Sequence, residues 1–441
     1  MGCPMMFLEE ELLRRLELGA DESGPSPRAL RVAIYSHDAQ GLGHLRRNLL
    51  ISRSLFAEDV RPSVLLISGL RETAAYDLPA GVDSVTLPAF GKGTDGSYYP
   101  RSLRIDTEHL ARLRSGLIHA AVASFQPDVL IVDKLPLGIF GELKPALMWL
   151  KDQMGVSVVL GLRDILDEPE TVRAEWERDH CIEAIRKFYD RVWVYGDRRV
   201  FDTVAEYSLP EDVASKTRYV GYLNPRDVPA GQSRARPGQA ALAESMDLPP
   251  GPLTLCVIGG GRDGLPLATA FLNAKLPAGS GGVLVTGPLM EREDRALLHA
   301  MAEHRPDLRI IEFVTDPQPL MCCAERVICM GGYNTVCEVL AFQKRALIVP
   351  RVRPRREQII RAERLAAMGL VDVLHPDELS GEALSAWINS AHHAVVPAES
   401  VLDFHGAQRL PELLIEALLA SARKSLCPQV VTVDKKASNH V

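Results

Sequence analysis

The chain has 441 residues, of which 46% are apolar and 24% are charged. This length gives room for two or three domains, and this composition excludes wholesale disorder. The 50 Lys and Arg residues are outnumbered by 57 Asp and Glu residues, so the net charge of −7 excludes a general attraction to nucleic acid.

The start of the chain predicts a short amphipathic helix within residues 1–18, where leucines are interleaved with Glu and Arg. We assign residues 1–27 to this helix and a linker. The segment lacks the apolar centre of a secretory signal, and no apolar run approaches the roughly 18 residues of a membrane helix. We therefore expect a cytoplasmic protein with no transmembrane segment.

The eight cysteines are too few for a disulfide framework in a chain of this length. Cys322, Cys323, Cys329 and Cys337 are clustered, but their spacing differs from the paired Cys-x-x-Cys pattern of zinc ligands. We expect reduced, buried thiols and no metal site.

From residue 28 onward, short apolar segments alternate with longer helical patterns, which is typical of parallel strands joined by crossover helices. A stretch rich in Pro, Gly, Ala and Arg separates two such series and is predicted to be a linker. We expect an α/β protein with doubly wound domains at 28–224 and 251–400, a linker at 225–250, and a crossover helix and tail at 401–441. The predicted strands are 31–36, 64–68, 84–87, 129–132, 156–161, 191–195, 218–220, 253–258, 282–286, 309–313, 326–329, 346–349 and 371–374.

Residues 91–100, rich in Gly and Tyr, are predicted to form a flexible loop of the first domain. This loop either lines a ligand cleft or is an ordinary surface connection.

The loops that leave a strand and enter a helix deserve the closest attention, because ligands of open parallel sheets bind beyond the carboxyl ends of the strands. The first such loop contains Gly41, Gly43 and His44, and these glycines would allow close approach of a phosphate or an acceptor. A dinucleotide-binding fingerprint needs a third glycine where this chain has Arg46. This difference disfavours a nicotinamide-dependent oxidoreductase.

The second loop contains Gly260, Gly261 and Arg262 after the strand at 253–258. Consecutive glycines can cradle phosphate oxygens, and Arg262 would add positive charge. A purely structural turn is the alternative. The chain lacks the Gly-Lys-Ser/Thr sequence of a P-loop, so a P-loop ATPase is disfavoured.

The third loop, with Gly332, Asn334, Thr335 and Glu338, follows the strand at 326–329. Thr335 and Glu338 have the spacing of a capping box, in which each side chain satisfies a backbone N–H at a helix start. Alternatively, a diphosphate binds at the helix N-terminus and Glu338 accepts hydrogen bonds from a ribose diol. The spacing is compatible with both interpretations.

Four arginines, at 351, 353, 355 and 356, precede Glu357 and Gln358. Such a run is usually a solvated face. Because it follows the strand at 346–349, the alternative is that arginines of this run bind phosphate while Glu357 and Gln358 bind sugar hydroxyls.

The segments 313–316 (Phe-Val-Thr-Asp), 329–338 (Cys-Met-Gly-Gly-Tyr-Asn-Thr-Val-Cys-Glu), 346–350 and 356–358 resemble the donor-binding half of GT-B glycosyltransferases. The resemblance is to the family 28 type, which adds N-acetylglucosamine to the lipid-linked peptidoglycan precursor. Gly41-Leu42-Gly43-His44 is similar to the N-terminal glycine-rich loop of that type. The resemblance extends over residues 31–374 and is most specific in the second half.

This resemblance implies two Rossmann-like domains whose parallel sheets face an interdomain cleft. It implies that main chain at Phe313 and Val314 contacts the base and that Glu338 contacts the ribose. The diphosphate would lie against Gly260, Gly261 and Thr335, and the donor sugar against Glu357 and Gln358. The complete predicted donor site is Gly260, Gly261, Arg262, Phe313, Val314, Gly332, Asn334, Thr335, Glu338, Arg356, Glu357 and Gln358.

The resemblance also places His44 across the cleft as a base or a phosphate contact, with helix-start packing as the alternative. Asp164, after the strand at 156–161, is a second candidate base for the acceptor. Its alternative is a structural role, paired with Arg163 or capping a turn. The family pattern is less basic where this chain has Arg351, Arg353 and Arg355, and the first half shows no apolar membrane-docking patch in its sequence.

We therefore expect a glycosyltransferase that moves a sugar from a nucleoside diphosphate donor, with UDP favoured, to a hydroxyl or amine acceptor. The chain lacks an Asp-x-Asp motif, so no metal and no cofactor besides the donor substrate are expected. The alternatives are a nucleotide-sugar 2-epimerase on the same scaffold and a non-catalytic nucleotide-sugar-binding protein. The oligomeric state is not predicted.

Overall fold

The computed structural model describes residues 29–38, 42–56, 60–71, 73, 76, 78–93, 97–228, 246–261, 263–391 and 395–426. The predicted N-terminal helix, the predicted site residues Gly41 and Arg262, and most of the predicted linker lie outside the described residues.

The N-terminal domain is built on a parallel sheet of seven strands in the order β3-β2-β1-β6-β7-β8-β9. Helices lie between most successive strands, as predicted. The strands are β1 (Arg31–Ser36), β2 (Ser63–Ser68), β3 (Val82–Thr86), β6 (Val129–Asp133), β7 (Ser157–Arg163), β8 (Arg191–Tyr195) and β9 (Thr217–Tyr219). The helices are α2 (Gly43–Ser54), α3 (Thr107–Phe125), the 3-10 turn η2 (Ile139–Gly141), α4 (Lys144–Lys151), α5 (Pro169–Arg178), α6 (Cys181–Phe188), α7 (Thr203–Glu206) and α8 (Glu211–Ala214).

The C-terminal domain repeats this architecture with a parallel sheet of six strands in the order β12-β11-β10-β13-β14-β15. The strands are β10 (Leu253–Val257), β11 (Gly281–Val285), β12 (Leu308–Ile311), β13 (Ala324–Cys329), β14 (Arg345–Ile348) and β15 (Asp372–Val373). The helices are α10 (Leu265–Asn273), α11 (Arg292–Ala302), α12 (Gln318–Cys323), α13 (Tyr333–Ala341), α14 (Glu357–Ala367), the 3-10 turn η4 (Pro376–Glu378) and α15 (Gly381–Ile388).

Central strands of both sheets are buried along their whole length and are mostly apolar, because helices cover both faces. Every residue of β6, β10 and β11 is buried, which is the pattern of strands in a covered parallel sheet. All thirteen predicted strands are present in these two sheets.

Each sheet has a point where the strand order reverses, between β1 and β6 in the first sheet and between β10 and β13 in the second. In doubly wound sheets, ligands bind outside the carboxyl ends of the strands at this point. The loops after β1, β6, β10 and β13 are therefore the loops that the topology selects for ligand binding. Three of these four carry the predicted glycine-rich sequences.

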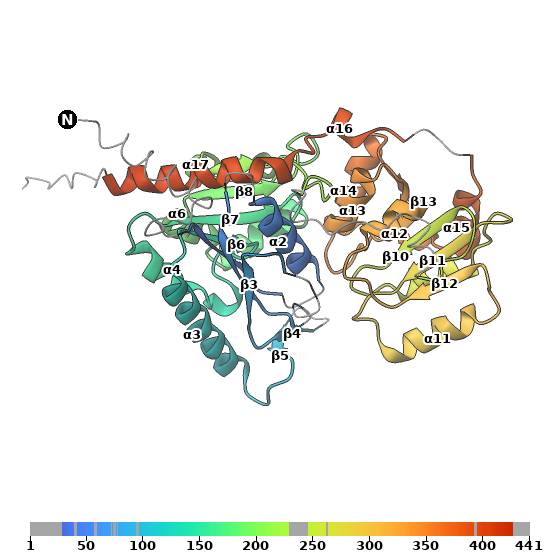
Figure 1. Ribbon diagram of the computed structural model, residues 1–441, viewed down its shortest axis with the longest axis horizontal. Helices are drawn as coiled ribbons and strands as arrows, with labels where there is room; N and C mark the ends of the chain where they lie inside the picture. Colours follow the sequence, from blue (N-terminus) through green and yellow to red (C-terminus); the bar gives the residue numbers. More distant parts are fainter. Residues whose placement is uncertain are drawn as a thin grey trace, which may run out of the picture.

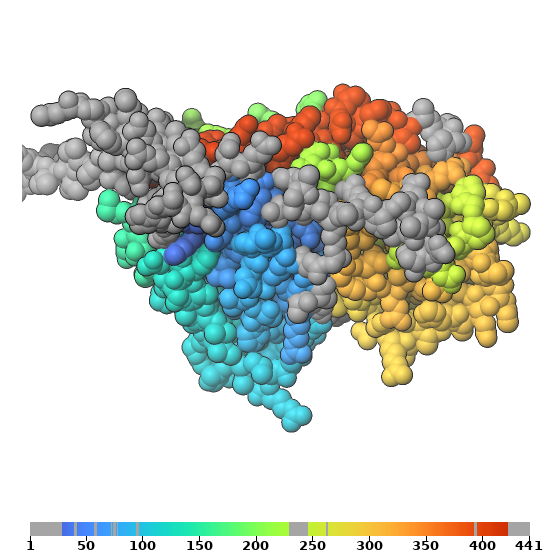
Figure 2. Space-filling model, in the orientation of Figure 1, coloured from blue at the N-terminus to red at the C-terminus, as the bar shows by residue number. Residues whose placement is uncertain are grey.

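The chain crosses back to the N-terminal domain at its end, as the sequence led us to expect. After α16 (Ala398–Val401), helix α17 (Gly406–Leu426) lies along the N-terminal domain and contacts α2, β6 and β7. Leu410, Leu414 and Leu418 are buried in this contact. Figure 1 shows α17 above the first sheet, and Figure 2 shows the two domains side by side beneath these red C-terminal residues.

The predicted loop at 91–100 contains a two-stranded antiparallel hairpin, formed by β4 (Phe90–Lys92) and β5 (Tyr98–Pro100). Phe90 is buried and anchors this hairpin in a small cluster with Leu110 and Ile139. The interpretation as a plain flexible loop is wrong for the described residues, because an aromatic side chain in the first strand packs against the domain.

The exposed large hydrophobic side chains of this domain come from β5, α3, η2, α4 and the segments around them, and α3 packs against both β5 and α4. They are Tyr99, Leu103, Ile105, Leu113, Leu117, Phe140, Met148 and Met154. No helix among the described residues is both long and apolar enough to cross a membrane.

Candidate functional site

The starts of helices α2 and α13, one from each domain, meet at the domain interface (Figure 1). The Nδ2 atom of Asn334 donates a hydrogen bond of 2.8 Å to the carbonyl oxygen of Gly43. Both residues were predicted site residues, and 291 positions separate them in the chain. The structure thus joins the first and third predicted loops across the interface.

Helix α13 begins without a side-chain cap. Its N-cap residue is Gly332, so Thr335 lies at the third helical position. No side chain accepts a hydrogen bond at this helix start, and the capping-box interpretation of Thr335 and Glu338 is therefore wrong. The uncapped N-terminus leaves N–H groups and the positive end of the helix dipole for an anion.

Space for such an anion exists next to Gly332. A Cβ atom built on Gly332 would meet no heavy atom within 4 Å, and its φ of −60° is one that any residue adopts. Backbone strain therefore does not require glycine at position 332. A ligand that lies close to the backbone would explain the absence of a side chain there.

Glu338 is buried, and the guanidinium of Arg46 donates a hydrogen bond to its Oε1 atom across the interface. Burial raises the pKa of the Glu338 carboxyl to about 7, and the charge of Arg46 only partly opposes this effect. Arg46 occupies the position at which a dinucleotide fingerprint would have its third glycine. A ribose at Glu338 would therefore share the carboxylate with Arg46 or displace it.

The turn after β10 contains one glycine that the packing requires and one that lies next to open space. A Cβ atom on Gly261, whose φ is +99°, would lie 2.4 Å from the carbonyl oxygen of Thr286, so packing alone requires this glycine. Gly260 accepts a hydrogen bond of 2.9 Å from the backbone N–H of Leu289. A Cβ atom on Gly259 would meet nothing within 4 Å. The structural interpretation explains Gly261, whereas open space at Gly259 permits a ligand.

The predicted base-contacting residues lie after β12. Phe313 and Val314 are partly buried against the core, and the Phe313 ring lies 6.4 Å from the ring of Tyr76 of the other domain. Phe313 is thus near the interface.

His44 stands at the start of α2 and is oriented by Asp133, the last residue of β6. The Nδ1 atom of His44 lies 2.8 Å from an Asp133 oxygen, and Arg47 donates to both Asp133 oxygens at 2.6 Å. Burial alone would raise the pKa of the Asp133 carboxyl, but Arg47 and His44 outweigh it and hold the pKa far below its usual value. An ionised Asp133 that accepts the Nδ1 proton leaves Nε2 of His44 as a proton acceptor.

Sequence reasoning missed Asp133. The available signal was its place as the last residue of a buried strand next to β1, at the point of strand-order reversal. Without the strand order, nothing local connects it to His44, 89 residues away.

Asp164 has a structural environment, which favours the structural interpretation over that of a base. Its side chain is fully buried, and Arg361 of the C-terminal domain donates to both of its oxygens, at 2.6 and 2.8 Å. Tyr222 donates a further hydrogen bond of 3.0 Å. A carboxylate engaged in this way has no exposed oxygen for an acceptor proton. Its partner is Arg361, not the expected Arg163.

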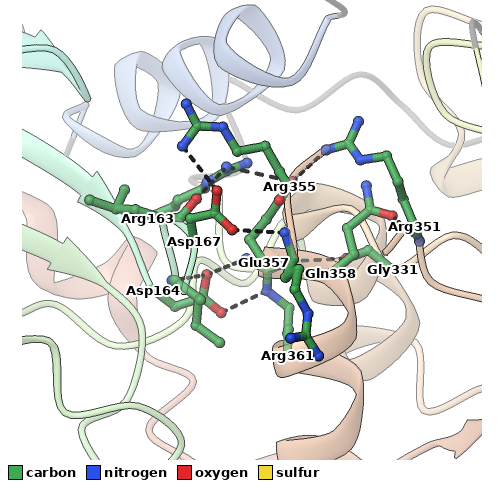
Figure 3. Close-up of polar contacts among 12 residues, drawn as sticks. Arg163, Asp164, Asp167, Gly331, Arg351, Arg355, Glu357, Gln358 and Arg361 are labelled. Carbon is green, nitrogen blue, oxygen red and sulfur yellow. Dashed lines mark hydrogen bonds and ion pairs between the residues drawn. The ribbon is translucent and has the colours of Figure 1, made fainter. Parts of the chain in front are cut away.

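The arginine run contacts both domains, and the interpretation as a solvated face is wrong for Arg351 and Arg355, whose side chains are only about a quarter exposed. Arg355 donates to Asp167 and Glu175, at 3.0 and 2.6 Å. The backbone N–H of Arg356 donates to Asp167 at 2.7 Å. Figure 3 shows Arg355 and Asp167 close to the start of α14.

Arg351 organises the two predicted sugar-binding residues. Its guanidinium donates to Glu357 at 2.7 Å, and its backbone N–H donates to Oε1 of Gln358 at 2.9 Å (Figure 3). Glu357 is buried, which would raise its pKa, but Arg163, Arg351 and Arg361 together lower it to about 2. Glu357 is therefore an ionised acceptor at neutral pH.

Within the described part of the chain, no group of three His, Cys, Asp or Glu side chains could hold a metal ion. The cysteines described there are free thiols, and Cys181, Cys256, Cys329 and Cys337 are buried.

Residues 254–394 match the family model "Glycosyltransferase family 28 C-terminal domain". Over 181 residues, the chain is 27% identical to a protein of Mannheimia succiniciproducens named UDP-N-acetylglucosamine--N-acetylmuramyl-(pentapeptide) pyrophosphoryl-undecaprenol N-acetylglucosamine transferase. This match covers 38% of the chain and 49% of that protein, so the chain spans about half the length of this curated relative.

Two solved structures share the two-domain arrangement. A UDP-GlcNAc 2-epimerase from Neisseria meningitidis, bound to UDP-GlcNAc, aligns with a TM-score of 0.55 and 13% identity, over 88% of this chain and 99% of its own. MurG of Acinetobacter baumannii aligns with a TM-score of 0.50 and 15% identity, over the same shares. The predicted GT-B fold and the resemblance to family 28 glycosyltransferases are confirmed.

Proposed function

We propose that this chain, with its GT-B fold and its second domain of the family 28 type, transfers a sugar from a nucleoside diphosphate donor to a hydroxyl or amine acceptor. One observation carries the proposal. The two helix starts at the two strand-order reversals face each other across the interface, and one presents His44 with Asp133 while the other presents an uncapped N-terminus with Glu338 nearby.

The donor would lie on the C-terminal domain. Its diphosphate would accept hydrogen bonds from the first turn of α13 and lie in the open space beside Gly332 and Gly259. Its ribose would donate to Glu338, and its sugar hydroxyls would donate to Glu357. We favour UDP because the relative named above acts on a UDP sugar, and we place the reaction in the cytoplasm, where such donors are made.

The acceptor would lie on the N-terminal domain, with its hydroxyl or amine next to Nε2 of His44. His44 removes the acceptor proton as the new bond to the sugar carbon forms. The bond between that carbon and the diphosphate breaks, and the departing negative charge is stabilised by the α13 N-terminus. No metal ion is required in this scheme, because the helix N-terminus supplies the positive potential.

The test is calorimetric titration with UDP, TDP and GDP of the parent protein, Gly332→Ala and Glu338→Ala. We expect UDP to bind most tightly. A methyl group at residue 332 fits the protein but occupies the diphosphate space, so Gly332→Ala is expected to lose at least about tenfold in UDP affinity, or about 1.4 kcal/mol. Glu338→Ala is expected to lose a similar amount.

The control is Gly116→Ala on the outer face of α3, where an added Cβ also meets nothing within 4 Å. It should bind UDP like the parent. Equal UDP affinity of Gly332→Ala and the parent would refute the proposed diphosphate position. A second assay with UDP sugars distinguishes a glycosyltransferase from a 2-epimerase and from a non-catalytic binding protein. Release of UDP only in the presence of an acceptor supports sugar transfer. Formation of an epimeric sugar without an acceptor indicates a 2-epimerase. UDP binding without either product indicates a non-catalytic protein.

A further inference from the structure

One cation at the interdomain site, Lys134, lacks a counter-ion. Lys134 follows Asp133 at the end of β6 and is partly buried. Among the described residues, its ammonium group makes neither a hydrogen bond nor an ion pair. Burial lowers the pKa of Lys134 to about 7, and repulsion by Arg163 and Arg355 adds to this effect against the attraction of Glu357.

The backbone of Lys134 is also unusual. Its φ of +73° lies in the left-handed region, which favours glycine and asparagine over lysine. Its N–H is held there by a hydrogen bond of 2.8 Å to the carbonyl oxygen of Gly161. A lysine in this conformation, with an unmatched charge, is unfavourable for folding. Binding of a ligand is a physical reason for lysine at this position.

Further unsatisfied polar atoms lie beside Glu357, which attracts Lys134. The Nε atoms of Arg163 and Arg351 and the Oε2 atom of Glu357 are buried without hydrogen-bond partners. Arg163 and Arg351 both reach the other oxygen of Glu357, at 3.6 and 2.7 Å. Figure 3 shows Arg163 approaching from the N-terminal domain and Arg351 from the C-terminal domain. We call Lys134, Arg163, Arg351 and Glu357 the Lys134 cluster.

The other charges at this place are already matched. Arg355 is paired with Asp167 and Glu175, and Arg361 is paired with Asp164. The unmet requirements of the cluster are one negative charge for Lys134 and one hydroxyl donor for Glu357. A polyhydroxylated ligand with an acidic group meets both requirements.

Building on the proposed function, we infer that the Lys134 cluster binds an anionic group, a carboxylate or a phosphate. This group is distinct from the donor diphosphate and is carried by the transferred sugar or by the acceptor. Its position supports this assignment. Lys134 is adjacent in sequence to Asp133, which orients His44, and it acts electrostatically on His37, whose ring lies 4.7 Å from that of His44. The anion would therefore lie on the side of the interface that carries His44. It belongs either to the transferred sugar or to the acceptor.

The experiment compares the parent with Lys134→Met by calorimetry, using UDP, UDP-glucose and UDP-glucuronate. If the transferred sugar carries the anion, the parent binds UDP-glucuronate at least tenfold more tightly than UDP-glucose, and Lys134→Met abolishes this difference. If the acceptor carries it, inorganic phosphate binds saturably to the UDP-saturated parent and not to UDP-saturated Lys134→Met. Lys144→Met, at an exposed position of α4, is the matched control and should behave like the parent.

Two readouts keep the inference separate from the proposed function and from misfolding. Lys134→Met is expected to raise the unfolding temperature, because it removes an unmatched and partly buried charge. Lys134→Gly, which also suits the positive φ, is the second variant should Met fail to fold. If UDP does not bind the parent, the proposed function fails. The inference alone is refuted if UDP binds the parent but binding of neither UDP-glucuronate nor phosphate depends on Lys134. It is also refuted if Lys134→Met weakens the binding of UDP itself as strongly as that of UDP-glucuronate.

Discussion

At the scale of single residues, the buried carboxylate of Asp133 serves two neighbours. It neutralises Arg47, which is itself buried, and it holds the ring of His44 by Nδ1. Positioning by an ionised partner sets the tautomer and the ring orientation of a histidine. Asp133 is thus a positioning residue, and His44 is the group that would touch the acceptor.

We expect His44→Gln to lower kcat by roughly 10²- to 10⁴-fold, the usual contribution of a general base, while leaving the dissociation constant of UDP unchanged. Single-turnover rates with a UDP sugar and acceptor, together with calorimetry, measure the two quantities. Asp133→Asn should also lower kcat while leaving the dissociation constant of UDP unchanged, a split that a merely structural role would not produce. An unaltered rate for His44→Gln would remove the base assignment.

Glu338 predicts a pH dependence of nucleotide binding. Its pKa is raised to about 7 in the folded protein, and only the ionised carboxylate accepts hydrogen bonds from both ribose hydroxyls. UDP affinity should therefore rise with pH from about 5 to 7, by at most tenfold per unit, and then level off. The terminal phosphate of UDP itself titrates near pH 6, so Glu338→Gln, which retains only that contribution, is the control.

The same raised pKa has a consequence for stability with a definite sign. Between the unfolded value near 4.5 and about 7, the folded protein binds more protons at Glu338 than the unfolded chain. The contribution of this group to stability is therefore present below the lower value and is lost as the pH rises to 7. Chemical denaturation at several pH values should show a flatter profile for Glu338→Gln. An identical profile would contradict the raised pKa.

At the scale of elements, α14 joins the two domains by its first two turns. Its start carries Glu357, and one turn later Arg361 reaches Asp164 after β7 and also donates to the carbonyl oxygen of Gly331 at 3.0 Å. A single helix thus connects the first domain, the predicted sugar contacts and the loop before α13. Movement of α14 would change all three together.

Removal of Arg361 is therefore expected to be severe. Arg361→Leu leaves the Asp164 carboxylate buried and unpaired, which should lower the free energy of unfolding by roughly 3–5 kcal/mol. Arg364→Leu on the same helix is the control, since its pair with Glu206 is largely exposed and worth about 1 kcal/mol or less. Urea denaturation followed by circular dichroism measures both. Similar stabilities for the two variants would show that the buried pair is not a main domain contact.

At the scale of the whole molecule, the described domains are connected by polar contacts along the interface and by the return of the chain in α17. The contacts of Arg46 with Glu338 and of Asn334 with Gly43 lie where the donor would bind, whereas the pair of Arg361 with Asp164 is fully buried. Donor binding therefore requires rearrangement at the first two contacts and can leave the third in place. This division is compatible with domain movement about a fixed ionic contact.

Much of the fold could be predicted because its signals are local. A parallel strand covered on both faces is a continuous apolar run, so β1, β8 and β10 can be recognised from a few neighbouring residues. The glycine turns after β1, β10 and β13 could be found in the same way. The hairpin of β4 and β5 could not, because its strands have three residues each and depend on Phe90 packing elsewhere.

The amino-acid sequence alone determined the two doubly wound domains, the loops at their carboxyl edges and Glu338 as a residue of interest. Tertiary structure decided which charges meet. His44 and Asp133 are 89 residues apart, Asp164 and Arg361 197, and Arg46 and Glu338 292. Strand order and domain contact bring these groups together, and the low polarity of the interior then makes each pairing strong. Such pairings depend on three-dimensional proximity, which no local pattern in the chain encodes.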